Sequence, residues 1–186
     1  MNIEIVSGSA RQASITYRLA LYLQKVLKER TDHQVNIIDV RDWEFPQELE
    51  GVYSSVEKTT PVHKPLAERM FAADAFIMVS PEYNGSYSTF LKNLFDHFPK
   101  QMHKTFGIAA GAPGAMGGIR ACLQMQDLVA ALFGIASPYM LITPFVDKKI
   151  SEDGILVDTA FQGMVDSFVA EFLWLSERLT TEAVKG

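Results

Sequence analysis

The chain alternates between two hydrophobic patterns. Short runs rich in β-branched residues, the first of them at residues 3–6, have the length and composition of buried strands. Between them lie longer stretches in which apolar residues recur every three or four positions, as on one face of a helix. The pattern predicts five strands, at residues 3–6, 35–40, 75–79, 105–110 and 139–143. It predicts five helices, at about residues 14–30, 64–73, 90–98, 117–133 and 161–172.

Strands that alternate with helices indicate an α/β protein with a parallel sheet covered on both faces. Right-handed crossovers and a first strand rich in β-branched residues favour a doubly wound, flavodoxin-like sheet of five strands in the order 2-1-3-4-5. The expected architecture is therefore three layers, α/β/α. Ligands of such folds bind beyond the carboxyl ends of the strands, so the loops after strands one, three and four are the expected site.

Length and composition agree with one compact domain over residues 1–186. Apolar residues make up 48% of the chain and charged residues 21%, which excludes an intrinsically disordered protein. The net charge is −5, and the longest basic run is Lys148-Lys149. We therefore expect no nucleic-acid partner.

Membrane and metal chemistry are not expected either. Glu4 stands where a signal peptide carries its positive region, and no apolar stretch is long enough to span a bilayer, so the sequence predicts a cytoplasmic protein without a membrane partner. The single cysteine, Cys122, is expected to be a core residue. The four histidines lack metal-ligand spacing and are expected at the surface or at an interface: His33, His63, His97 and His103.

The first candidate loop has the composition of a phosphate site. Ser9, Arg11, Ser14 and Thr16 surround the predicted start of a helix, where free N–H groups and the helix dipole favour an anion. Two interpretations are open. The loop binds a phosphate monoester through its hydroxyls and the Arg11 guanidinium, or Ser14 only caps the helix and Arg11 is solvated.

The loop after the third predicted strand reads Ser80-Pro81-Glu82-Tyr83-Asn84-Gly85-Ser86. Proline fixes one φ and Asn-Gly adopts positive φ, so the main chain is able to present its polar groups to a flat heteroaromatic edge. The simpler interpretation is a tight turn, with Ser86 capping the next helix and Lys92 paired with Asp96, and both interpretations can hold at once.

The loop after the fourth predicted strand has Gly111, Gly114, Gly117 and Gly118 within eight residues. Glycines at this place permit close approach of the main chain to a ligand, or else form a linker that binds nothing. Neither G-x-x-x-x-G-K-[ST] nor a G-x-G-x-x-G after the first strand occurs, so P-loop and dinucleotide-binding Rossmann sites are not supported.

Three motifs carry a resemblance to a known family. Gly8-Ser9-x-Arg11-x-x-Ser14 resembles G-S-x-R-x-x-S, residues 81–86 with Leu91-Lys92-Asn93 resemble P-E-Y-N-G-S-x-P-x-x-L-K-N, and residues 117–121 resemble G-G-x-R-A. These are motifs of the NADPH-dependent FMN reductases, the flavodoxin-like quinone, azo and chromate reductases. Two positions depart from the pattern: Ser88 replaces the usual Pro, and Ile15 replaces the Asn of many members.

The resemblance implies FMN as cofactor, NADPH or NADH as hydride donor and a small-molecule electron acceptor, in a homodimer or homotetramer. It implies an FMN site in which the first loop holds the phosphate and the other two line the flavin. The residues implied are Ser9, Arg11, Ser14, Ile15, Thr16, Pro81, Glu82, Tyr83, Asn84, Gly85, Gly111, Gly114 and Gly117.

The chemistry belongs to the flavin, so the sequence predicts no catalytic acid or base among the side chains. Two other functions stay open: an FMN-binding electron carrier that does not turn over nicotinamide, and a flavodoxin-like interaction domain without a ligand. Residues 41–61 lack clear periodicity. They are expected either to lie over the substrate opening or to pack on the sheet edge.

Overall fold

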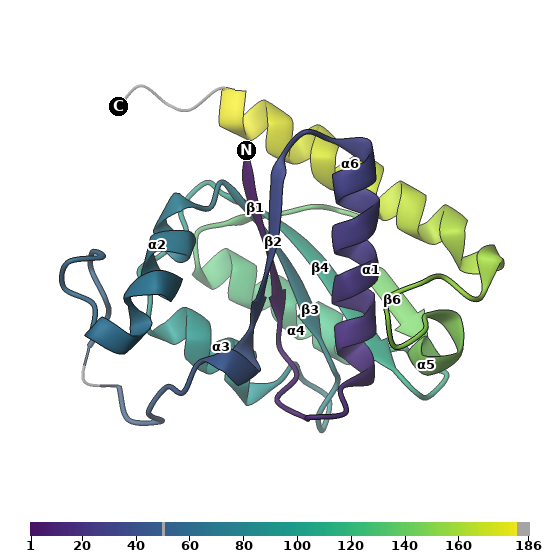
Figure 1. Ribbon diagram of the computed structural model, residues 1–186, viewed down its shortest axis with the longest axis horizontal. Helices are drawn as coiled ribbons and strands as arrows, with labels where there is room; N and C mark the ends of the chain where they lie inside the picture. Colours follow the sequence, from purple (N-terminus) through teal and green to yellow (C-terminus); the bar gives the residue numbers. More distant parts are fainter. Residues whose placement is uncertain (50, 182–186) are drawn as a thin grey trace.

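The computed structural model describes residues 1–49 and 51–181, which form one parallel sheet between two layers of helices (Figure 1). The strand order is β2-β1-β3-β4-β5, with β6 also paired to β4, so the predicted 2-1-3-4-5 order is confirmed. The strands are β1 (Asn2–Ser7), β2 (Gln34–Asp39), β3 (Ala75–Ser80), β4 (Thr105–Ala112), β5 (Ile135–Ala136) and β6 (Leu141–Pro144). The helices are α1 (Ile15–Arg30), α2 (Lys64–Ala72), α3 (Thr89–Asp96), α4 (Ile119–Ala131), α5 (Val146–Lys149) and α6 (Gln162–Thr181).

The fifth position of the sheet is divided between two short strands. β5 pairs with β4 at Thr105 and Phe106, and β6 pairs with β4 from Ala109 to Ala112. Pro138 lies between the two and has no N–H to donate to a ladder, which accounts for the interruption. The prediction of one strand at residues 139–143 was therefore wrong in its extent, although it placed the strand at the correct edge.

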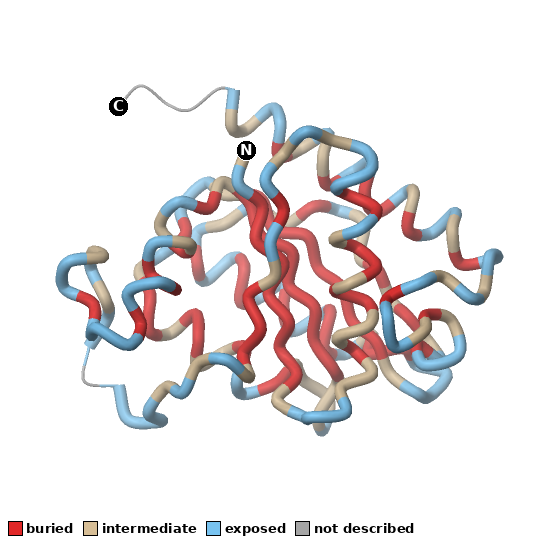
Figure 2. The backbone as a smooth tube through the Cα atoms, viewed as in Figure 1, coloured by how far each residue is buried: buried red, intermediate tan, exposed pale blue. Residues whose placement is uncertain are grey.

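Each face of the sheet carries its own apolar core. α1, α5 and α6 cover one face, where Leu23 and Phe168 are fully buried, and α2, α3 and α4 cover the other, where Phe106 and Cys122 are fully buried (Figure 2). All six residues of β3, at the centre, are buried. The three-layer prediction and the expected core position of Cys122 are confirmed. The prediction missed α5, because a single turn is too short to show a helical period.

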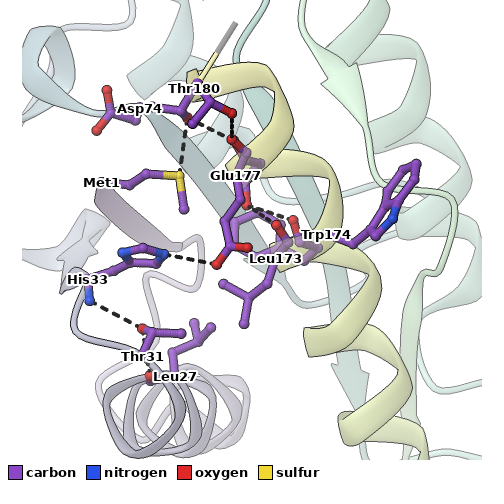
Figure 3. Close-up of polar contacts among 12 residues, drawn as sticks. Met1, Leu27, Thr31, His33, Asp74, Leu173, Trp174, Glu177 and Thr180 are labelled. Atoms are coloured by element: carbon purple, nitrogen blue, oxygen red, sulfur yellow. Dashed lines mark hydrogen bonds and ion pairs between the residues drawn. The ribbon is translucent and has the colours of Figure 1, made fainter.

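The C-terminal helix is fixed at the end of the sheet where the strands begin. The His33 ring contacts the Glu177 carboxylate at 3.2 Å, and the Thr180 hydroxyl donates to the Met1 sulfur at 3.1 Å (Figure 3). These contacts lie at the opposite end from the loops that follow β1, β3 and β4.

One buried ion pair joins the sheet to α2. Glu4 on β1 is 3% exposed, and both of its carboxylate oxygens accept from Arg69, at 3.1 Å from Nε and 2.5 Å from Nη2. A carboxylate in such a place is tolerated because a guanidinium offers two parallel donors.

Replacing Arg69→Met is expected to lower the free energy of unfolding by about 3 kcal/mol, because the Glu4 charge stays buried without its partner. Adding Glu4→Leu to that variant removes the charge and is expected to recover most of the loss. Urea denaturation measures both. Arg30→Met, which breaks the more exposed pair with Asp166, is the control and should cost less than about 1 kcal/mol. A full loss retained in the double variant would contradict the explanation.

Candidate functional site

The loops that follow β1, β3 and β4 leave the sheet side by side. Ser7 at the end of β1 lies beside Val79 of β3, and Ser80 at the end of β3 lies beside Ala110 of β4. The three loops therefore gather at one edge of the sheet, the lower edge in Figure 1. The expected convergence of these three loops is confirmed, and the ligand site that they were expected to form stays a prediction.

The first loop, residues 8–14, leaves several donors unused. The Ser14 side chain accepts from the Tyr17 N–H at 3.1 Å, which confirms that Ser14 caps α1. The main-chain N–H groups of residues 9–12 make no hydrogen bond within the described part of the chain. Ile15 packs against the apolar core, so it offers the site only its main chain. The loop thus presents N–H groups to a ligand.

Arg11 joins the first loop to the second, the loop between β3 and α3. Its guanidinium lies 5.0 Å from the centre of the Tyr83 ring, in cation–π geometry. A cavity of about 740 Å³ opens beside this contact, lined by Ala10, Arg11, Glu82, Tyr83, Asn84 and Phe90. Its volume lies within the range of about 300–1,000 Å³ that is typical of small-molecule sites.

The loop between β3 and α3 contains a tight hairpin. Tyr83 and Ser86 exchange main-chain hydrogen bonds at 2.8 and 3.2 Å, and Asn84 and Gly85 have φ of 52° and 84°. Positive φ at both central residues is the geometry that Asn-Gly favours. The tight-turn interpretation is confirmed, as is the ion pair of Lys92 with Asp96. Pro81, two residues before the hairpin, is buried.

Ser88, and not Ser86 as expected, caps α3. Its side chain accepts from the Leu91 N–H at 3.1 Å and donates to the Gly8 carbonyl in the first loop. Its own N–H donates to the Ser80 hydroxyl at 3.0 Å. The Ser86 prediction was wrong because Ser86 is engaged in the hairpin. The proline usual in the family has neither of the donors that Ser88 uses here.

Two further contacts complete the link among the three loops. A Glu82 carboxylate oxygen accepts from the Arg120 N–H at 3.1 Å, and the other lies 3.6 Å from the Arg120 guanidinium. The Thr16 hydroxyl donates to the Gly111 carbonyl at 3.4 Å. The Thr16 hydroxyl therefore donates its hydrogen bond within the protein and not to a ligand. Glu82 connects the hairpin to the start of α4.

The glycines of the third loop, residues 111–118, have different structural reasons. A Cβ on Gly117, where φ is 61°, would lie 2.6 Å from the Pro144 nitrogen, and a Cβ on Gly118, where φ is 89°, would lie 2.7 Å from the Ala110 Cβ. Close packing requires glycine at both. A Cβ on Gly111 would lie 3.2 Å from Val146, whereas Gly114 faces open space. Close packing therefore explains the glycines at 117 and 118, whereas no contact within the protein requires glycine at 114.

The prediction that the histidines lie at the surface or at an interface was wrong for two of them. His63 and His97 are each 4% exposed and contact the Phe45 ring, His63 by stacking at a centroid distance of 4.2 Å and His97 in a tilted arrangement at 4.4 Å. The Tyr53 hydroxyl lies 2.9 Å from His63 Nδ1, and His63 Nε2 contacts the Glu44 carbonyl at the same distance. These partners lie far apart in the sequence, so spacing alone could not reveal them.

Residues 40–49 border the first loop as well. Arg41 donates to both Asp39 oxygens and to the Gln12 carbonyl, the latter at 3.0 Å. The hydrogen bond with Asp39 raises the pKa of the Arg41 guanidinium. This segment therefore packs at the sheet edge and also touches the site.

Other chemistries find little support in the described residues. Those residues include no group of three or more metal-ligating side chains. No helix among them is long and apolar enough to cross a membrane. Burial raises the pKa of the Cys122 thiol to about 12, which keeps it protonated.

Comparison with known proteins is consistent with this geometry. The family model described as NADPH-dependent FMN reductase matches residues 1–144. An FMN-dependent NADPH-azoreductase of Staphylococcus aureus is 34% identical over 175 residues, which cover 91% of this chain and 92% of that protein.

Solved structures support the fold. The flavoenzyme FerB, an NAD(P)H:(acceptor) oxidoreductase from Paracoccus denitrificans, superposes with a TM-score of 0.74 at 22% identity, over 94% of this chain and 97% of that chain. A flavodoxin variant from Pseudomonas aeruginosa has a TM-score of 0.58 at 16% identity, over 92% of this chain and 99% of that chain. At these identities the two structures bear on the fold alone.

Ser88→Ala is expected to lower the free energy of unfolding by about 1–2 kcal/mol, because it removes the cap of α3 and the bond to Gly8. Ser88→Pro also removes the N–H that Ser80 accepts, so it is expected to be at least as destabilising. Urea denaturation gives the values. Ser167→Ala, at an exposed helical serine, is the control, and a Ser88→Pro variant as stable as the unaltered protein would refute the role given to Ser88.

Cys122 is expected to be inert toward Ellman's reagent at pH 8 in the native protein, because a raised pKa keeps it a thiol below about pH 11. In urea the thiol is exposed and its pKa returns to about 8.5, so one equivalent should react. Absorbance at the thiolate product's maximum follows the reaction, and rapid reaction of the folded protein would show that this side chain is accessible.

Proposed function

The chain belongs to the NADPH-dependent FMN reductase family, and from this we propose that it binds FMN across its three loops and passes electrons from NADPH or NADH to a small-molecule acceptor. The observation that carries the proposal is the cavity of about 740 Å³ between Arg11 and the Tyr83-Asn84 hairpin. It lies where doubly wound folds bind their ligands, and its two ends differ in chemistry.

The end formed by the first loop fits a phosphate. The N–H groups of residues 9–12 are free of partners within the described chain, and the N-terminus of α1 lies behind them. Ser14 accepts at its oxygen but has a hydroxyl proton left to donate. Among the described residues Arg11 contacts only the Tyr83 ring, so its guanidinium N–H donors are available to an anion. In this proposal Ser9, Arg11 and Ser14 hold the phosphate with the main chain of Ile15 and Thr16.

The end formed by the hairpin fits a flat ring. Asn84 and Gly85 turn the main chain outward, and Tyr83 forms one wall of the cavity. Glu82 is held by Arg120, so it fixes the spacing between the second and third loops. We assign Pro81 to Gly85 to one side of the flavin and the open loop at Gly114, between Gly111 and Gly117, to the other.

Bound FMN supplies the redox chemistry: it accepts two electrons as hydride from the nicotinamide and releases them to the acceptor. The side chains of this chain therefore bind and orient. Main-chain N–H groups of the hairpin would stabilise negative charge on the ring, and no side chain is assigned as acid or base.

The acceptor belongs to the classes that this chemistry serves, namely a quinone, an azo compound, a metal oxyanion or a free flavin. Support for the azo class is the azoreductase of S. aureus, which is 34% identical to this chain. A homodimer or homotetramer in the cytoplasm stays a prediction. An electron carrier and an interaction domain differ from a reductase in one respect, because neither oxidises nicotinamide.

Anaerobic addition of NADPH to the FMN-loaded protein is expected to bleach the flavin absorbance near 450 nm, and a quinone is expected to restore it. A flavin spectrum that persists with both NADPH and NADH would favour the electron carrier. A protein that binds no FMN at micromolar concentration would favour the interaction domain.

Arg11→Ala is expected to weaken FMN binding by a factor of about 10 to 150, which corresponds to the loss of one charge-assisted hydrogen bond of about 1.5–3 kcal/mol. Quenching of FMN fluorescence on titration with protein measures the affinity. Arg178→Ala is the matched control, because Arg178 also rests on an aromatic ring, that of Trp174, but lies on α6. Equal affinity of the Arg11 variant would remove Arg11 from the phosphate site.

A further inference from the structure

The middle of the first loop has a single anchor. Of the main-chain groups of residues 9–13, only the Gln12 carbonyl has a hydrogen-bond partner in the described part of the chain. That partner is the Arg41 guanidinium, which donates through Nη1 at 3.0 Å. The conformation of the loop that was assigned to the phosphate therefore depends on a side chain that follows β2.

The Arg41 side chain is itself held in a fixed geometry. Its Nε donates to both Asp39 carboxylate oxygens at 3.0 Å, and its Nη2 donates to the same carboxylate. Its main-chain N–H also donates to Asp39, at 3.0 Å, which caps the short 3₁₀ helix at Val40–Asp42. The guanidinium lies 4.6 Å from the centre of the Tyr17 ring on α1. These contacts leave Nη1 directed at the first loop.

The bond to the Gln12 carbonyl also orients the next N–H group. A trans peptide unit is planar, and its C=O and N–H point in opposite directions. With the carbonyl turned toward Arg41, the Ala13 N–H is turned away from Arg41, and it has no partner among the described residues. The bond thus directs a free donor just before α1, where free N–H groups favour an anion.

The charge of Arg41 is balanced by its partner. Because the Asp39 carboxylate lies against the guanidinium, the pair presents little net charge to an anion in the loop. Arg11, by contrast, contacts only the Tyr83 ring among the described residues. The two arginines therefore differ: Arg11 is available to a ligand, whereas Arg41 is engaged within the protein.

We propose that Arg41 is a positioning residue of the phosphate site, which acts through the Gln12 carbonyl and gives the site its preference for a phosphorylated flavin. The inference rests on the proposed function. Arg41 does not touch the phosphate in this proposal. It holds residues 9–13 in the conformation that their N–H groups need in order to bind it. Without this anchor the loop adopts more conformations, and ordering them on binding costs free energy.

Arg41→Met removes the donors and keeps a long side chain. FMN is expected to bind about three- to tenfold more weakly to this variant, as for the loss of one hydrogen bond. The affinity for riboflavin, which has no phosphate, is expected to stay unchanged. Titration of each flavin's fluorescence with protein gives both affinities. The FMN-to-riboflavin ratio is the readout, because a general loss of folded protein would weaken both flavins alike.

Arg18→Met is the matched control. The Arg18 side chain is 19% exposed, against 20% for Arg41. It too donates to main-chain carbonyls, those of Asp147 and Ile150, and it pairs with the Glu152 carboxylate. None of these partners belongs to the first loop, so this variant is expected to leave the ratio unchanged.

Two further variants separate positioning from charge. Adding Asp39→Asn to Arg41→Met removes the carboxylate that the single variant leaves unpaired, and FMN binding is expected to stay weak. Arg41→Lys keeps the positive charge. A single ammonium does not reproduce the fork that bonds Asp39 and Gln12 together, so this variant is expected to recover only part of the lost FMN affinity.

Full recovery of FMN binding in the double variant would show that the unpaired Asp39 charge repels the phosphate. Full recovery in Arg41→Lys would show that charge alone matters, and either result would overturn the proposal. An unchanged FMN-to-riboflavin ratio in Arg41→Met would also overturn it, while leaving the phosphate site intact. If the unaltered protein showed no preference for FMN over riboflavin, the phosphate site itself would be refuted, and the role of Arg41 with it.

Discussion

Hydrogen bonds between side chains and loops hold the carboxyl edge of the sheet as a single unit. The pairs are Ser88 with Gly8, Glu82 with Arg120, and Thr16 with Gly111. Parallel pairing of β1, β3 and β4 brings the loops to the same edge, but pairing alone does not set their spacing. The three contacts set this spacing within the protein itself, and a site held in this way loses little entropy on binding. The free N–H groups of residues 9–12 and the Tyr83 wall both depend on this arrangement.

Much of this arrangement could be predicted from the sequence because it is local or topological. The helical period of α1 and the β-branched composition of β1 indicated the elements, and alternation indicated the parallel sheet. Ser14 as a cap and Asn84-Gly85 as a tight turn followed from the chemistry of adjacent residues. The position of the site then followed from the strand order.

What the sequence could not predict depends on contacts between distant residues. Ser88 and Gly8 are 80 positions apart, so the sequence did not reveal the hydrogen bond between them. The only sign of it was that Ser88 replaces the proline usual in the family. His63 and His97 became buried because Phe45 inserts between long-range partners, and no spacing rule describes that. The reasons for glycine at 117 and 118 are likewise close approaches, to Pro144 and Ala110, that only the folded chain contains.

We propose above all that the first loop binds the phosphate of FMN. Riboflavin has the same ring and lacks that phosphate, so the ratio of the two affinities isolates the contribution of the loop. Charge-assisted hydrogen bonds contribute about 1.5–3 kcal/mol each, so FMN is expected to bind at least about a hundredfold more tightly than riboflavin in parallel fluorescence titrations. Equal affinities would show that the phosphate is not held and would contradict the account.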